Sequence, residues 1–253
     1  HDLTAAFNDI DPSGTNSYPV GTPGQGWYEP HPWGGVPGIF KAMTDQAGLA
    51  YDVSHSLRGG ATLRGHLINS NPAGWDMRAN IASDRWDVVV LQGNSTEALN
   101  RAGGSYLQFK GYVGLLSRFI TDGTAFSFRD RDLFPGATTA AQTAACVAET
   151  GLSSGSCNLQ RPIPANPNAN PQAQIYLYQT WARPDMTYPA GEPYSGEPLE
   201  TMTADLGAAY SQATFNNGGI AGIVRVAHEG EILGDALLAQ NFPLIHTVGR
   251  AAA

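Results

Sequence analysis

The chain has 253 residues, of which 42% are apolar and only 14% are charged, and its formal net charge at pH 7 is −8. This length suits one large domain or two small ones, and the apolar fraction is that of a chain with an ordinary core. The sequence has no cluster of Lys and Arg and no apolar run approaching about 18 residues, so we expect neither a nucleic-acid partner nor a membrane span.

The low charge, with 30 glycines and 17 prolines, indicates long neutral loops of the kind common in secreted proteins. We therefore expect a secreted, extracellular or periplasmic protein, and a start at His1 without Met is consistent with processing or truncation. Cys146 and Cys157 share one neutral segment, and we expect a disulfide between them. Two free thiols are the alternative.

Residues 1–33 show no apolar periodicity and are expected to be loop. A helix is predicted over 34–47, and an alternating, half-buried strand over 49–57. Residues 62–81 are expected to be helical in part, with an interruption at Asn71-Pro72. The side chains of the first helix expected to point inward are Ile39, Phe40 and Met43.

The segment Val88–Leu91 is a run of four apolar residues, which predicts the strand buried on both faces around which the fold is organised. Apolar residues at steps of three and four then predict an amphipathic helix over 106–120. Residues 123–172 are rich in Ala, Thr, Asn and Pro, and we expect a long loop insertion there.

Further strands are predicted over 173–181 and 219–227, and further helices over 197–215 and 232–240. This alternation implies right-handed crossovers and a mostly parallel sheet. We therefore predict a single α/β domain over 1–253, built as a three-layer α/β/α sandwich.

Polar residues follow two of the predicted strands at their carboxyl ends. Gln92, Gly93, Asn94 and Ser95 follow the first strand, and Trp181 ends the second. In open α/β sheets, ligands bind beyond the carboxyl ends of the strands. Gln92, Ser95 and Trp181 are therefore candidate substrate-binding residues.

The order of these polar strand ends resembles the SGNH/GDSL hydrolases, in particular their secreted branches. SLRGGATL supplies Gly59-Gly60 where that family has the glycine of its second block, and LQGNS supplies Gly93-Asn94 for its third block. The stretches GGVPGIF, WDVVVLQ and IYLYQTWAR also resemble the group, and the likeness extends over roughly residues 34–238.

The resemblance implies a flavodoxin-like hydrolase fold, serine–histidine chemistry and no cofactor. It places an oxyanion hole at the Gly60 N–H and the Asn94 side-chain amide, which are donors of the kind that acyl transfer needs. The alternative is that both are ordinary turn residues.

The serine and histidine blocks match the family less well. The serine block should precede GGVPGIF, so it would fall near or before His1, and Ser17 is the nearest candidate nucleophile within the chain. The last block should be D-x-x-H, and the chain has Pro243 where the aspartate belongs, followed by His246 as candidate base. Asp235 is the nearest acid, and His228 is a weaker candidate base.

A copper site that uses His1 with a second histidine is an alternative, with His31, His55 and His66 as candidates. No spacing resembles a known metal motif, so we expect no metal. The sequence thus predicts a secreted esterase or deacetylase that acts on an acyl ester, small or carried by a glycan. The alternative is a non-catalytic carbohydrate-binding or structural protein on the same fold. Several loop aromatics suit sugar stacking, and the other interpretation is that they cover the edge of the sheet.

Overall fold

The computed structural model describes residues 8–9, 40, 43–56, 60–68 and 76–225. The chain divides into two compact units. One comprises His1–Ala61, Asn69–Asp84 and Ala227–Ala253, and the other comprises Thr62–Ile68 and Arg85–Val226. Among the helices in the described ranges, none is both long enough and apolar enough to cross a membrane.

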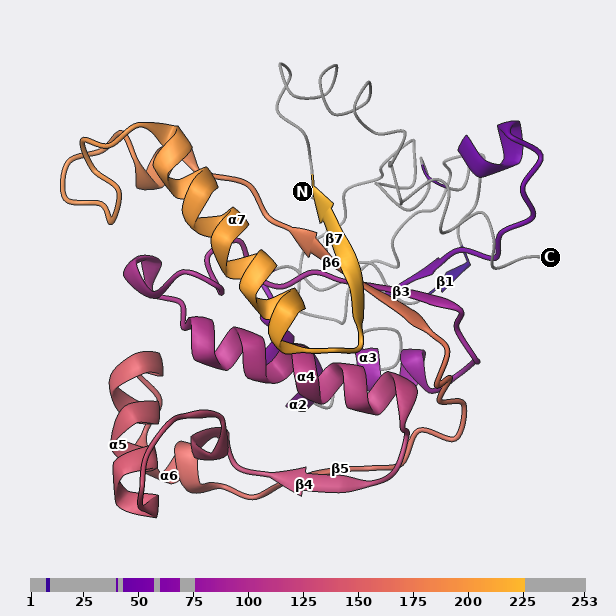
Figure 1. Ribbon diagram of the computed structural model, residues 1–253, viewed down its shortest axis with the longest axis horizontal. Coiled ribbons are helices and arrows are strands. Elements are labelled where there is room, and N and C mark those ends of the chain that lie inside the picture. The colour runs from indigo at the N-terminus through magenta and orange to yellow at the C-terminus, as the bar shows by residue number, and fades with distance from the viewer. Residues whose placement is uncertain (1–7, 10–39, 41–42, 57–59, 69–75, 226–253) are drawn as a thin grey trace, which may run out of the picture. The chain divides into compact units, whose positions relative to one another are not determined.

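The second unit contains a parallel sheet of three strands, β3 (Val88–Leu91), β6 (Gln174–Gln179) and β7 (Ile220–Arg225), in the order β3-β6-β7 (Figure 1). Val88 pairs with Gln174 and Leu91 with Leu177, while Leu177 also pairs with Ile223. Three of the four predicted strands therefore form a parallel sheet, and the unit is mixed α/β as expected.

Two long helices connect these strands. α4 (Tyr106–Thr121) follows β3, and α7 (Leu199–Asn216) joins β6 to β7 and packs on both strands (Figure 1). Ser105 caps α4, since its hydroxyl accepts a hydrogen bond from the Gln108 N–H at 3.2 Å. The apolar stripe predicted for 106–120 is confirmed, and α7 has a similar stripe. The buried residues of the two stripes are Phe109, Val113, Leu116 and Ile120 on α4, and Met202, Leu206, Tyr210 and Ala213 on α7.

The middle strand is β6, and the expectation that Val88–Leu91 is the central, doubly buried strand is wrong. Val90 is 46% exposed, whereas Ile175, Tyr176 and Leu177 of β6 are all buried. The reason is position, because within the described residues β3 has a neighbouring strand on one side only. A run of four apolar residues predicts a strand but not its place in the sheet.

The segment expected as a loop insertion contains regular structure. β4 (Phe126–Phe128) pairs antiparallel with β5 (Arg161–Ile163), and between them lie η2 (Asp130–Leu133), α5 (Thr139–Thr150) and α6 (Ser154–Asn158). The predicted disulfide joins Cys146 of α5 to Cys157 of α6. Both sulfurs pack with Phe134 in a small buried cluster, so the crosslink supplies the core that two short helices lack.

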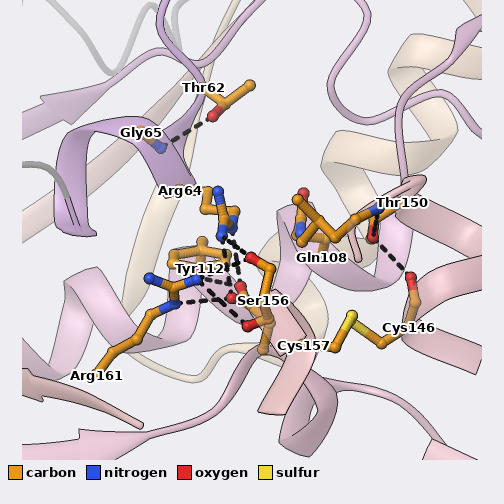
Figure 2. Close-up of polar contacts among 12 residues, drawn as sticks. Thr62, Arg64, Gly65, Gln108, Tyr112, Cys146, Thr150, Ser156, Cys157 and Arg161 are labelled. Carbon is orange, nitrogen blue, oxygen red and sulfur yellow. Dashed lines mark hydrogen bonds and ion pairs between the residues drawn. A yellow bond between two sulfur atoms is a disulfide. The ribbon is translucent and has the colours of Figure 1, made fainter. Parts of the chain in front are cut away.

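A buried ionic network fastens this segment to the rest of the unit (Figure 2). The carboxylate of Asp130 is fully buried and accepts hydrogen bonds from Arg64 of α2 (Leu63–Ile68) at 2.9 and 3.1 Å, and from Arg161 at 2.8 Å. The Tyr112 hydroxyl on α4 donates to the same carboxylate at 2.5 Å. Burial alone would raise the pKa of Asp130, but these donors outweigh it and hold the pKa below its usual value.

Asparagines order the Pro-rich stretch that leads into β6. The Asn166 side chain donates to the Phe119 main-chain oxygen at 3.0 Å, and the Asn170 side chain donates to the Trp86 main-chain oxygen at 2.9 Å. Both residues are buried. Their amides replace the main-chain hydrogen bonds that a segment with three prolines cannot form.

The first unit contains β2 (Ser54–His55), which pairs antiparallel with β1 (Asn8–Asp9), and α3 (Met77–Ile81), capped by Asp76. The prediction that 49–57 joins the parallel sheet is therefore wrong. Its alternating pattern is half polar, which suits a short two-stranded ribbon better than a doubly covered strand. Met43, expected to point inward, is 51% exposed, and residues 43–46 are helical as predicted. The predicted helix over 232–240 lies outside the described residues.

Candidate functional site

The loops after β3 and β6 meet at the carboxyl edge of the parallel sheet. The Thr180 hydroxyl donates to the main-chain oxygen of Ser95 at 3.0 Å, and the Arg183 guanidinium donates to the Ser95 hydroxyl at 3.3 Å. Thr180 is buried, whereas Gln92 is exposed at the end of β3. The structure thus brings two of the predicted substrate-binding positions, Gln92 and Ser95, to the edge where ligands bind in such sheets.

Asn94 forms a local turn through its side-chain oxygen. This oxygen accepts hydrogen bonds from the Thr96 N–H at 3.2 Å and from the Thr96 hydroxyl at 3.3 Å. Asn94 is therefore a turn residue, which was the alternative to its oxyanion role. It uses only the acceptor half of the amide, and the Asn94 amide nitrogen has no hydrogen-bond partner among the described residues. The donor half is available to a ligand.

The residue that sequence reasoning missed is Glu97. It is only 5% exposed, and its carboxylate accepts two hydrogen bonds from the Leu63 N–H at the start of α2, each at 2.9 Å. Backbone N–H groups of Arg64 and Asn94 also face it. Burial nevertheless dominates and raises the pKa of Glu97 to about 7, because within the described residues no cationic side chain pairs with it.

Two glycines make room for this carboxylate and its loop. A Cβ added at Gly93 would lie 2.0 Å from the Glu97 Oε2 atom, and one at Gly104 would lie 2.1 Å from the Thr96 main-chain oxygen. Gly93 is also part of the LQGNS motif on which the family resemblance rests. Its physical role in the structure is to let the loop fold back over Glu97.

A small polar hollow lies beside Glu97 and has a volume of about 110 Å³. Its lining residues come from the start of α2, the loop after β3, α4 and the end of α5. They are Thr62, Asn94, Thr96, Glu97, Gly103, Gly104, Ser105, Gln108 and Thr150. The side-chain nitrogen of Gln108 is buried there without a hydrogen-bond partner in the described part of the chain.

Tyr210 of α7 connects Glu97 to the neighbouring strand end. Its hydroxyl is hydrogen-bonded to Thr180, and burial together with the nearby Glu97 charge raises the pKa of Tyr210 to about 12. Tyr210 is therefore neutral at physiological pH. Glu97, Tyr210, Thr180 and Ser95 thus form one polar cluster under the carboxyl edge.

The loop after β6 carries two exposed aromatic rings. Trp181 is 50% exposed and Tyr188 is 71% exposed. The end of this loop is held by the buried Tyr194, whose hydroxyl donates to Asp205 at 2.8 Å and whose ring lies 4.1 Å from the Arg101 guanidinium. Trp181 follows β6 two residues after its last residue, Gln179.

The remaining candidate site residues belong to other elements or lie outside the described residues. Gly60 belongs to the first unit and has a φ of +68°, with no atom within 4 Å of an added Cβ, as in an ordinary turn. His66 is buried in α2, and His55 lies in β2. The candidates outside the described residues are Ser17, His246, His228, Asp235, His1 and His31.

One feature of the sequence could have indicated Glu97. It stands directly before the apolar pair Ala98-Leu99, both of which are buried, in a loop that follows an apolar strand. An acidic residue in such a place is either solvent-exposed or held by main-chain donors, and the pattern alone does not say which.

Comparisons of the chain with protein-family models, with curated proteins and with solved structures find no match.

Proposed function

We propose that the protein is a secreted hydrolase of the SGNH type that cleaves an acyl ester, small or carried by a glycan, at the carboxyl edge of β3 and β6. The observation that carries the proposal is the contact between the two strand ends, in which Thr180 and Arg183 both bind Ser95. A three-layer α/β/α arrangement is part of the same proposal, since a parallel sheet needs cover on both faces.

In the proposed reaction, the Ser17 hydroxyl attacks the ester carbonyl carbon while His246 accepts its proton. The C–O bond to the alcohol then breaks, and His246 returns the proton to the leaving oxygen. Water repeats the sequence on the acyl-serine and releases the acid. The Asn94 amide donates to the negative oxygen, and the Asn94 turn supports this role because it leaves the amide nitrogen unoccupied.

The disulfide between Cys146 and Cys157 supports secretion, because such bonds persist in oxidising compartments.

A serine-reactive phosphonate tests the proposal. We expect the intact protein to gain the mass of one phosphonate group, mapped to Ser17 by peptide mass spectrometry, and we expect Ser17→Ala to abolish the label. The matched control is Ser211→Ala on α7, which should retain the label. A folded protein that takes no label would count against serine chemistry.

The second candidate is a non-catalytic carbohydrate-binding protein. The exposed rings of Trp181 and Tyr188 favour it, since exposed aromatic faces on a fixed loop suit sugar rings. An array of unesterified glycans separates the two. Binding that is lost in Trp181→Ala and retained in Asn94→Asp, in a protein that hydrolyses no ester, would select this candidate.

A further inference from the structure

We propose that the hollow beside Glu97 is a binding pocket for a small neutral group that carries an acceptor oxygen, either a carbonyl or a hydroxyl. Thr62, Gln108 and Thr150 of this hollow are labelled in Figure 2. The proposal does not depend on ester hydrolysis. It stands on the polar groups of the hollow and on which of them already have partners.

The hydroxyl groups that line the hollow are occupied. Thr62 accepts from the Gly65 N–H at 2.9 Å, and Thr96 donates to Asn94 at 3.3 Å. Ser105 caps α4, and Thr150 donates to the Cys146 main-chain oxygen at 2.6 Å while accepting from Leu152 at 3.2 Å. These groups shape the hollow, but their hydrogen bonds hold the protein's own turns and helix ends.

The remaining polar groups are donors. The Gln108 side-chain nitrogen is buried without a partner in the described residues, and a buried donor left unpaired costs about 1–3 kcal/mol. The carboxyl group of Glu97 is the second donor, because its pKa of about 7 leaves a large protonated fraction at neutral pH. The Asn94 amide nitrogen also lines the hollow and has no partner among the described residues, so it is a third donor. Three donors beside one hollow match an acceptor oxygen of a ligand.

The charges of the residues around the hollow argue against an anionic or a cationic ligand. An anion in the hollow would lie against Glu97 with no cationic lining residue to compensate it. A cation would require ionised Glu97, whose oxygens already accept the Leu63, Arg64 and Asn94 N–H groups, and it would repel the Gln108 donor. A neutral ligand avoids both costs.

The size of the hollow limits the ligand. A volume of about 110 Å³ equals that of three or four water molecules at ~30 Å³ each. An acetyl group, a primary amide or the hydroxymethyl group of a sugar has this size.

Three probes of similar size and different charge test the proposal. They are acetamide, acetate and propylammonium, titrated separately and followed by ligand-observed NMR. We expect acetamide to bind most tightly. Its apparent Kd should fall about 30-fold between about pH 8.5 and about pH 5.5, because binding selects the protonated carboxyl. Within the described residues, Tyr210 is the titratable side chain that interacts with Glu97, and it stays neutral across this range.

Two variants locate the binding. Gln108→Met keeps the side-chain length and removes the donor, and we expect roughly a five- to tenfold loss of acetamide affinity. Glu97→Gln keeps a donor in place of the acid, so binding should persist and lose its pH dependence. The exposed Glu149→Gln is the matched control and should retain both affinity and pH profile. Circular dichroism confirms that each variant is folded.

Other outcomes overturn the proposal. Tighter binding of propylammonium would mean that Glu97 acts as an ionised receptor, and tighter binding of acetate would exclude a neutral ligand class. No binding of any probe at saturating concentration would mean that the hollow holds water alone. Binding that Gln108→Met and Glu97→Gln leave unchanged in affinity and pH profile would place the ligand elsewhere.

Discussion

The hydroxyl of Thr180 donates a hydrogen bond of 3.0 Å to the main-chain oxygen of Ser95, and this bond joins the ends of β3 and β6. The two strands are separated in the chain by the whole folded segment between Leu91 and Gln174. The bond therefore fixes one binding loop against the other, as a site on rigid elements requires.

Removing this bond should weaken both the fold and the site. In Thr180→Val, which keeps the shape and removes the donor, we expect a loss of about 1–2 kcal/mol in the free energy of unfolding, since the Ser95 oxygen loses its buried partner. Ester turnover should also fall. Thr180→Ser is the matched control and should behave like the wild type in urea unfolding and in turnover. Equal stability of the Val and Ser variants would contradict the account.

The stability of the protein should depend on the ionisation of Glu97. Its pKa rises from 4.5 to about 7 on folding, so the stability that it contributes is fully present below about pH 4.5 and is lost as the pH rises to about 7. The shift corresponds to about 3 kcal/mol. In Glu97→Gln, urea unfolding should show a correspondingly smaller loss between these pH values, whereas Glu149→Gln should keep the wild-type profile. If the free energy of unfolding depends on pH in the same way in Glu97→Gln and in the wild type, the raised pKa of Glu97 is refuted.

The buried carboxylate of Asp130 should be essential to the fold. Asp130→Asn leaves Arg64 and Arg161 without their counter-ion, and we expect about 3 kcal/mol of destabilisation in urea unfolding. Because the pKa of Asp130 is lowered, its contribution is present above about pH 4 and is lost as the pH falls further. The exposed Asp185→Asn is the control, and its unfolding midpoint should barely change. A comparable shift of the unfolding midpoint in both variants would show that the buried Asp130 network contributes no more stability than an exposed ion pair.

The disulfide should stabilise the segment between β4 and β5. It closes a short loop with a sequence separation of 11 residues, so Cys146→Ser with Cys157→Ser should cost about 2–3 kcal/mol. Thermal unfolding of the double variant measures this loss, with the reduced wild type as control. Thiol titration of the denatured, unreduced wild type should find no reactive thiol. Two reactive thiols would show that Cys146 and Cys157 are not bonded.

Periodicity in the sequence predicted the elements that carry a strong repeating pattern, namely α4, α7, β6 and β7. The apolar residues of α4, α7 and β6 are buried as this pattern predicts, whereas in β7 only Val224 is buried among the described side chains. The place of β3 at the side of the sheet was not predictable in this way, since strand order depends on pairing between distant segments.

The ordered structure of residues 123–172 escaped prediction for a different reason. Its order comes from one disulfide, from Asp130 and from asparagine side chains bound to distant main-chain oxygens. None of these contacts leaves a periodic apolar signal. Glu97 was missed similarly, because its burial is set by the N–H of Leu63, which lies 34 positions earlier in the chain.

The most direct test of the proposed ester site is the turnover of a short-chain aryl ester by Asn94→Asp. The aspartate keeps the side-chain oxygen that binds Thr96, and it replaces the amide nitrogen donor with a second, negatively charged oxygen. We expect the melting temperature to change little and kcat to fall on the order of 10²–10³-fold, the scale of losing one oxyanion donor. Asn94→Ala, which removes donor and turn together, should lose the same activity and also some stability. Wild-type turnover by a folded Asn94→Asp variant would contradict the assignment of this edge as the catalytic site.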